Sequence, residues 1–249
     1  MAVSVSLLAA SATLRVASLD LCADEYLLLL ARRGEIASVS RLAHDPADSV
    51  MWREARRSPA NRRELDSVIA TRPTLLLSTS GGGRATSLIA AKLGIRSLTL
   101  GYPASITEVE TTMVRVATAL GDARRAAGWR RRLARLKANP LPQRDTIFLG
   151  GGGNSLSARS LGAQWMGLGG LRQRALPGGR ASLETLASAP PQIVLRSTYR
   201  RHQPSLGQRW LDHPLARRSA ARMIATDGRP WTCAGPLMVS EIERLRRVI

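Results

Sequence analysis

Aromatic residues and lysine are scarce in this chain of 249 residues. Aromatic side chains make up 4% of it and phenylalanine occurs once, so a platform on which nucleic-acid bases stack is hard to build. Lysine occurs only at Lys92 and Lys137, so nearly all of the 37 basic residues are arginine. The formal net charge of +19 is typical of nucleic-acid-binding proteins, but arginines spread along the whole chain also fit a biased genome composition. We expect attraction to anionic ligands or surfaces rather than specific nucleic-acid binding.

Residues that bind metals are also few. The chain has three histidines (His44, His202 and His213) and two cysteines, and none of them has HExxH or CxxC spacing. The sequence therefore predicts no metal site.

Motifs of common enzymes are missing. Gly150–Gly153 follows an apolar run, as a phosphate-binding loop would, but no Gly-Lys-Ser/Thr follows it. A dinucleotide-binding loop starting at Gly150 or Gly151 would have Ser155 or Leu156 as its last glycine, and G-x-S-x-G does not occur. We expect no catalysis and no cofactor, with an uncharacterised α/β enzyme as one alternative and a basic nucleic-acid-binding protein as another.

Beyond the N-terminus, no apolar run approaches the roughly 18 residues that a membrane helix needs. Ala2–Ala12 is apolar or small and ends in Ala-Ser-Ala, which fits the small-residue rule for signal cleavage, although no basic segment precedes it. We interpret residues 1–14 as a signal peptide that has lost its beginning. An ordinary leader to the first strand is the alternative.

One pattern occurs twice, as ELDSVIATRPTLLL (Glu64–Leu77) and as SLETLASAPPQIVL (Ser182–Leu195). Each copy has an acid in the first turn of a short helix, a proline that ends the helix, and then an all-apolar run. A run without polar alternation is typical of a strand buried on both faces of a parallel sheet. The repeat predicts two similar α/β lobes, and such proteins bind ligands in the cleft between the lobes.

Helices and strands alternate along the rest of the chain, as in parallel sheets covered by helices. The expected strands outside the repeat are Arg15–Leu19, Ile36–Val39, Arg96–Leu100 and Thr146–Leu149, and the expected helices are Asp24–Arg33, Ala85–Leu93, Ser105–Leu120 and Ala123–Ala138.

The helix expected at Ala123–Ala138 differs from the others. Only Trp129, Leu133 and Leu136 form an apolar stripe, and arginine and alanine surround it. A helix this polar suits a strut across the surface between two lobes. We therefore expect two Rossmann-like α/β lobes, at residues 15–121 and 140–249, joined by a single long backbone helix at residues 122–139.

Four stretches in this order give the chain a resemblance to a family: RVASLDLCADEYL from Arg15, the repeated helix-to-strand unit, SITEVETTMVRVATALG from Ser105, and RPWTCAGP from Arg229. The chain resembles the helical-backbone class of periplasmic solute-binding proteins, which capture vitamin B12, ferric siderophores or haem for ABC importers. The resemblance implies a monomeric periplasmic protein that holds a corrinoid or ferric chelate between its lobes and meets a permease and an ATPase. The loop at His44 lacks the bulky aromatic residues with which the B12 binders of this class cup the corrin, which weakens the B12 assignment.

Ligands of open parallel sheets bind beyond the carboxyl ends of the strands. Applied to the expected strands, this rule gives a set of candidate ligand-binding residues. They are Leu21, Cys22, His44, Gly82, Tyr102, Asn154, Tyr199, Trp231 and Cys233. Trp231, in an expected cleft-facing loop, is the main aromatic candidate, whereas the other tryptophans lie in helical stretches and are expected to pack.

Cys22 and Cys233 fall on loops of opposite lobes. A disulfide between them would need Cα atoms within about 7 Å and would seal the site. We expect free thiols near the ligand or two unrelated buried cysteines instead.

The resemblance also implies an acidic residue on each lobe that meets arginines of the permease. Glu184 matches that position in the second lobe, whereas the aligned position in the first lobe is Arg84. The internal repeat offers Asp66 as the symmetric mate of Glu184. Acids also favour the first turn of any helix, so the pattern has an ordinary structural explanation as well.

Overall fold

The structure is a computed structural model that describes residues 13–249 except 63, 80–83, 201–204 and 218–220. Its strands form two sheets, and all strand pairs described are parallel. The strands are β1 (Val16–Ser18), β2 (Ile36–Ser40), β3 (Ala60–Asn61), β4 (Leu75–Ser78), β5 (Arg96–Thr99), β6 (Arg144–Leu149), β7 (Leu171–Gln173), β8 (Ile193–Ser197) and β9 (Arg222–Thr226).

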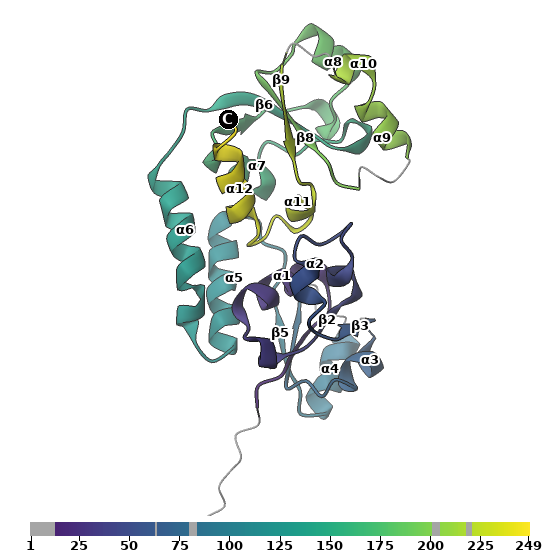
Figure 1. Cartoon of the computed structure of the whole chain (residues 1–249), viewed down its shortest axis with the longest axis vertical. Helices are drawn as coiled ribbons and strands as arrows, with labels where there is room; N and C mark the ends of the chain where they lie inside the picture. Colours follow the sequence, from purple (N-terminus) through teal and green to yellow (C-terminus); the bar gives the residue numbers. More distant parts are fainter. Residues whose placement is uncertain (1–12, 63, 80–83, 201–204, 218–220) are drawn as a thin grey trace, which may run out of the picture.

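Helices connect these strands and cover the sheets (Figure 1). The α-helices are α1 (Leu21–Leu30), α2 (Trp52–Ala55), α3 (Leu65–Ile69), α4 (Arg84–Lys92), α5 (Ile106–Ala119), α6 (Ala127–Ala138), α7 (Leu161–Leu168), α8 (Leu183–Ser188), α9 (Leu206–Leu211), α10 (Pro214–Arg217), α11 (Arg229–Cys233) and α12 (Met238–Arg246). Short 3₁₀ helices are η1 (Arg33–Glu35), η2 (Arg41–His44), η3 (Ala123–Ala126), η4 (Gly151–Gly153) and η5 (Pro177–Gly179). Within the described ranges, no helix has the length and apolar character needed to cross a membrane.

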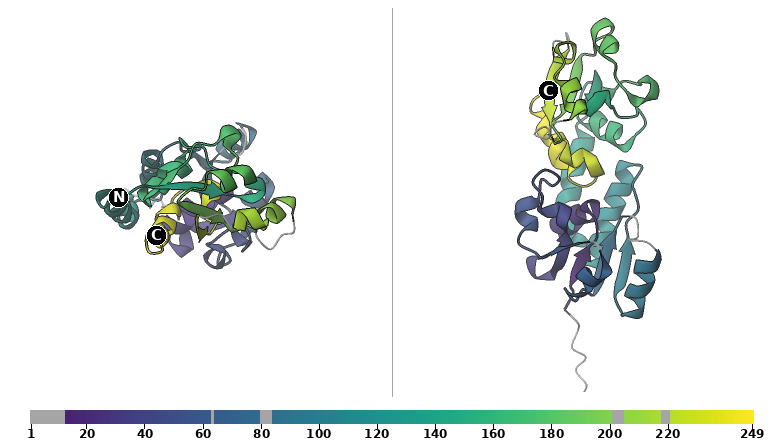
Figure 2. Two further views of the ribbon diagram at one scale, coloured as in Figure 1. Left: turned by 90° about the horizontal axis from the view of Figure 1, so that it is seen from above. Right: turned by 90° about the vertical axis from the view of Figure 1, so that its right-hand side faces the viewer.

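The first sheet has the order β3-β2-β1-β4-β5 and the second has the order β7-β6-β8-β9. They lie one above the other along the long axis of the molecule (Figures 1 and 2). The α/β fold with two parallel sheets is therefore confirmed.

The repeat forms matching units in the two sheets. α3 leads into β4, and α8 leads into β8. All four residues of β4 are buried, as are all residues of β8 except Arg196, which is half-buried. The apolar runs are thus interior strands, as their lack of polar alternation predicted.

Two helices, α5 and α6, connect the sheets and lie side by side (Figures 1 and 2). The stripe predicted on α6 is buried, because Trp129, Leu133 and Leu136 all belong to the main apolar core. α6 thus packs through a narrow face while its arginines stay at the surface.

Ion pairs attach this connection to both lobes. Arg125, in η3, donates to Glu35 beside α1 at 2.5 Å, and hydrogen bonds from this arginine lower the pKa of the Glu35 carboxyl. Arg132, in α6, donates to Glu243 of α12 at 2.6 Å, which lowers the pKa of Glu243 in the same way. The connection is thereby tied to the first lobe and to the last helix of the second.

Indole N–H groups hold the segment between α11 and α12. Trp129 donates to the carbonyl oxygen of Pro236 and Trp165 to that of Ala234, each at 2.8 Å. Both tryptophans are buried, so their expected packing role is confirmed. They fix the position of the chain just after Cys233.

Candidate functional site

The carboxyl ends of the two sheets meet in one region, which we call the seam. It is formed by residues that follow β1 and β2 on one side and β8 and β9 on the other: Cys22, Pro46, Asp48, Tyr199, Arg200, Arg229 and Cys233. This is the edge at which parallel sheets bind ligands. Residues that follow four of the strands therefore lie where the two lobes touch.

A disulfide crosses the seam and corrects the prediction for the cysteines. Cys22 and Cys233 are bonded, with their Cα atoms 5.4 Å apart. Cys22 lies in the first turn of α1, and Cys233 ends α11, after which Ala234 takes a left-handed conformation. The expectation of free or unrelated thiols was wrong because it did not foresee that α11 brings its last residue onto α1. The bridge does not fill the region, since two cavities lie at the seam.

A buried carboxylate forms the second link across the seam. The Asp48 side chain is 5% exposed and accepts hydrogen bonds from the Tyr199 hydroxyl at 2.8 Å and from Arg200 Nη2 at 2.6 Å. Charge-assisted bonds of this kind offset the cost of removing a carboxylate from water. Burial and the hydrogen bond with Asp48 raise the pKa of Tyr199. The phenol therefore stays protonated as a donor.

Arg229 forms the third link. Its guanidinium donates to the carbonyl oxygens of Pro46 at 2.7 Å and of Ser49 at 3.2 Å, and it pairs with Asp227 at 2.6 Å. Burial works to raise the pKa of Asp227, but hydrogen bonds from Arg229 outweigh it, so this pKa lies below its ordinary value. The two lobes are thus joined by one covalent bond and two polar clusters.

A cavity of about 490 Å³ lies beside these clusters. Both lobes contribute to its lining, which consists of Pro46, Ala47, Thr198, Tyr199, Arg200, Ala225, Thr226, Asp227, Arg229 and Arg244. Each of the three arginines has an acidic partner: Asp48, Asp227 or Glu241. The positive charges of the arginines in the lining are therefore largely balanced by these acids.

A second, smaller cavity of about 60 Å³ adjoins the disulfide. Its walls are Cys22, Tyr26, Thr79, Gly101, Tyr102, Pro103, Thr232, Cys233 and Gly235. Tyr102 is 73% exposed and Thr232 is also exposed, so the cavity lies at the surface of the seam. This small cavity, like the larger one, is a site between the lobes.

Four of the predicted ligand residues line these two cavities: Cys22, Tyr102, Tyr199 and Cys233. Leu21 is half-buried at the start of α1, next to Cys22. His44 is half-buried in η2, and its Nε2 atom is buried without a hydrogen-bond partner among the described residues. Asn154 is exposed, forms an isolated backbone β-bridge with Arg180, and lines neither cavity. Gly82 lies outside the described residues.

Trp231 has surroundings that differ from those expected. It lies in the short helix α11 rather than in a loop and is 9% exposed. Its ring packs 5.0 Å from that of Phe148, and its N–H donates to the Thr226 hydroxyl at 2.8 Å. The side chain thus has the contacts of a core residue, and its contact with a ligand stays a prediction.

The predicted docking acids lie on equivalent helices of the two lobes. Asp66 is exposed in the first turn of α3, and Glu184 is exposed in the first turn of α8. Hydrogen bonding from Ser182 lowers the pKa of Glu184, which keeps this acid charged. Both side chains can reach a partner.

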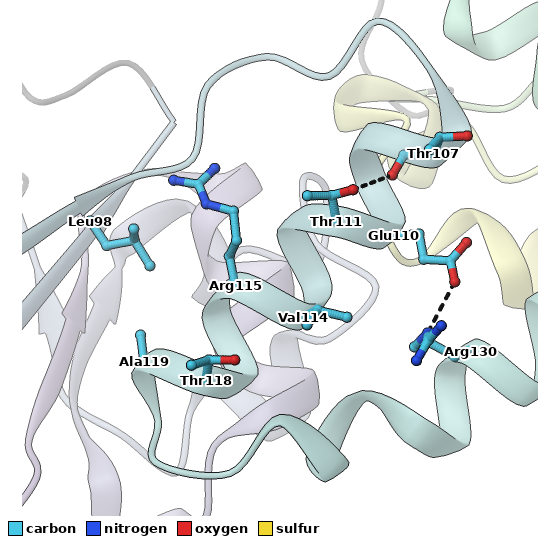
Figure 3. Close-up of a pocket in the computed structure, with 9 residues that line it drawn as sticks. All are labelled: Leu98, Thr107, Glu110, Thr111, Val114, Arg115, Thr118, Ala119 and Arg130. Carbon is cyan, nitrogen blue, oxygen red and sulfur yellow. Dashed lines mark hydrogen bonds and ion pairs between the residues drawn. The ribbon is translucent and has the colours of Figure 1, made fainter.

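Another cavity lies away from the strand ends. A groove of about 570 Å³ runs along α5 between β5 and α6, with the Glu110–Arg130 ion pair at one side (Figure 3). Its lining is Leu98, Thr107, Glu110, Thr111, Val114, Arg115, Thr118, Ala119 and Arg130. No residue of the seam contributes to it, so it is not part of the candidate site.

Residues that sequence reasoning did not select complete the seam. Arg200 and Arg229 stand close in the sequence to the candidates Tyr199 and Trp231, but nothing local marked them as cross-lobe donors. Asp48 lies in a polar stretch that the sequence predicted to be a loop, Ser40–Ser49, but it was not selected. Glu25 and Tyr26 lie on α1, where six of the ten residues are buried. The apolar run Leu27–Leu30 that follows them was the sequence cue that this helix would be widely buried.

Solved structures of other proteins resemble this chain in fold. No protein-family model matches the sequence, and no curated protein matches it. Among solved structures, the periplasmic haem-binding protein HutB of Vibrio cholerae superposes with a TM-score of 0.70 at 17% identity, over 95% of this chain and 98% of that one. A periplasmic haem-binding protein from Pseudomonas aeruginosa gives 0.68 at 19% identity, over 94% and 91%. A periplasmic binding protein from Veillonella parvula gives 0.71 at 14% identity, over 96% and 92%. The chain therefore has the two-lobe fold of periplasmic binding proteins over nearly its full length.

Proposed function

We propose that this protein is the periplasmic substrate-binding component of an ABC importer and captures a metal chelate between its lobes without catalysis. The observation that carries the proposal is the meeting of two parallel sheets, carboxyl end to carboxyl end, at a seam with cavities lined from both lobes. The fold likeness to periplasmic haem-binding proteins supports it.

The covalent and polar links at the seam fit capture with little movement. A disulfide, a buried carboxylate with two donors and an arginine bonded to two carbonyl groups all span the lobes. A site held in place before binding loses less conformational entropy when the ligand arrives. The lobes of this protein would therefore bind the chelate as a largely preformed cleft.

The ligand class follows from the resemblance and the fold neighbours. A corrinoid, a ferric siderophore and haem are the candidates. The importer partners would be a permease, docked through Glu184 and Asp66, and an ATPase, with the binding protein acting as a monomer.

Ligand titration tests the proposal. Purified protein would be incubated with cobalamin, cobinamide, haem and several ferric siderophores, and binding followed by tryptophan fluorescence and equilibrium dialysis. We expect tight binding of one of these classes at one molecule per chain. Binding of none of them, together with tight and steeply salt-dependent binding of duplex DNA, would instead identify a nucleic-acid-binding protein.

A further inference from the structure

Strand β5 leaves one edge of the first sheet open. It stands last in the order β3-β2-β1-β4-β5, and no strand of the described residues lies beyond it. All four of its residues are exposed except Leu98, which is half-buried. The backbone N–H of Arg96 bonds to Thr74, just before β4. Because alternate residues of a strand bond to the same neighbour, the N–H groups of Ser97 and Thr99 point away from β4.

The groove of about 570 Å³ lies directly beside this edge (Figure 3). Leu98 of β5 and Val114 and Ala119 of α5 line it. Arg115 of α5 donates to the carbonyl oxygen of Thr99 at 3.1 Å, which holds α5 alongside the strand. An open edge is a template for a strand from another chain. Such a strand would place every second side chain on the side of the groove.

The helix that precedes β5 also presents apolar side chains. Leu88, Ile89 and Leu93, on α4 and just after it, are 59%, 46% and 53% exposed. α4 packs against β5. Apolar side chains gathered on a surface in this way mark sites of protein interaction. Both helices that flank β5 in the sequence therefore offer apolar surface to a partner.

The charges beside the edge are mainly positive. Arg96 and Arg115 are exposed, and neither forms an ion pair with an acid of the described residues. Glu110 is the one acid that lines the groove, and it is shared by Arg130 at 3.0 Å and Lys137 at 3.1 Å. A second copy of this chain would bring the same cations face to face, which is unfavourable. A strand that carries acidic residues complements this surface instead.

We propose that the β5 edge and the adjoining groove bind an extended acidic segment of another protein. The segment would add a strand to the first sheet through the outward backbone groups of Ser97 and Thr99. On the side of the groove it would carry an apolar residue opposite Leu98, between two acids that pair with Arg96 and Arg115. No residue of the seam takes part, so this surface serves a protein partner and not the chelate.

A short peptide of the sequence Glu-Thr-Val-Thr-Glu, with blocked ends and a fluorescent label, is the probe. It reads alike in both directions and therefore fits a parallel or an antiparallel strand. The control peptide has lysine in place of both glutamates. Fluorescence anisotropy at low salt would measure binding of each peptide to the wild type and to three variants.

The variants separate backbone pairing from charge. Ser97→Pro removes one outward N–H without removing a bond to β4, so its melting temperature should stay near that of the wild type. Arg96→Glu reverses a charge beside the groove. Arg172→Glu is the matched control, because it reverses an exposed arginine on β7, the edge strand of the second sheet.

We expect the wild type to bind the acidic peptide about 10-fold more tightly than the lysine peptide, because two attractive pairs become repulsive. Loss of one hydrogen bond in Ser97→Pro should weaken binding about 2- to 10-fold. Arg96→Glu should weaken it about 3-fold or more, and Arg172→Glu should leave it unchanged. In the wild type, the bound peptide should slow hydrogen exchange of the Ser97 and Thr99 amides.

Three results would overturn the inference. The first is equal binding of the two peptides, or binding of neither. The second is binding of the acidic peptide that Ser97→Pro leaves unchanged, without slower exchange at Ser97 and Thr99, since charge alone would then hold the peptide. The third is a dimer in sedimentation that Ser97→Pro abolishes, which would show that a second copy occupies the edge. None of these results bears on chelate binding at the seam.

Discussion

Asp24 is a buried carboxyl group in the middle of the first lobe. It is 1% exposed and accepts hydrogen bonds from the Ser18 hydroxyl and from the backbone and side chain of Ser40. Burial raises its pKa to about 7, and the hydrogen bonds only partly oppose this effect. The raised pKa means that folding favours the protonated form of Asp24.

The pH dependence of stability follows from this shift. The contribution of Asp24 is fully present below its unfolded pKa, about 4, and is lost as the pH rises through about 7. Asp24→Asn removes this ionisation. The melting temperature of the variant minus that of the wild type should therefore be larger at pH 8 than at pH 5. Glu25 acts in the same direction and remains in both proteins. Thermal melting at the two pH values measures the effect, and an equal difference at both would show that Asp24 does not titrate in this range.

Trp231 gives a second prediction at the residue scale. Because its ring is buried against Phe148, Trp231→Ala should lower the free energy of unfolding by about 3–5 kcal/mol. Trp231→Phe keeps a ring at this position but loses the hydrogen bond to Thr226, so its loss should be nearer 1 kcal/mol. Urea unfolding measures both values. A stable Trp231→Ala protein with weakened ligand binding would instead support the ligand contact predicted from the sequence.

At the scale of elements, the disulfide between α1 and α11 has the clearest consequence for stability. It closes a chain segment of 211 residues, and a disulfide stabilises by restricting the unfolded chain, typically by about 2–4 kcal/mol. We expect the double variant Cys22→Ser/Cys233→Ser to lose stability of this order while keeping its fold, because the clusters at Asp48 and Arg229 still join the lobes.

Reduction provides the matched measurement. Wild-type protein in dithiothreitol should unfold at the urea concentration at which the double variant unfolds, and dithiothreitol should leave the variant unchanged. If reduction does not alter the unfolding of the wild type, the two cysteines are not bonded in solution.

At the scale of the whole molecule, the proposed docking and capture sites lie on different surfaces. Glu184 is exposed on α8 and lines neither seam cavity. Glu184→Lys should therefore abolish uptake in cells that carry the cognate permease and ATPase, with ligand affinity unchanged. Asp66→Lys tests the symmetric position on α3, and Glu54→Lys, which reverses an exposed acid on α2, is the control. Normal uptake with Glu184→Lys would show that docking occurs elsewhere.

Local patterns were sufficient for much of this architecture. The runs at Leu75–Leu77 and Ile193–Leu195 predicted interior strands because a strand buried on both faces needs apolar residues at every position. The narrow stripe on α6 predicted a helix that packs on one side only. The resemblance placed Trp231 in a cleft-facing loop, whereas Pro230 begins the short helix α11, where proline is well tolerated, and Trp231 lies within that helix.

The sequence by itself determined the class of fold and the repeated helix-to-strand unit, since both follow from the periodicity of neighbouring residues. Only the tertiary structure decided which residues meet where the carboxyl ends of the two sheets face each other. Cys22 pairs with Cys233, Asp48 with Arg200, and Arg229 with the carbonyl oxygen of Pro46. These partners are far apart in the chain, and their contacts depend on how one lobe packs against the other, which no local pattern specifies.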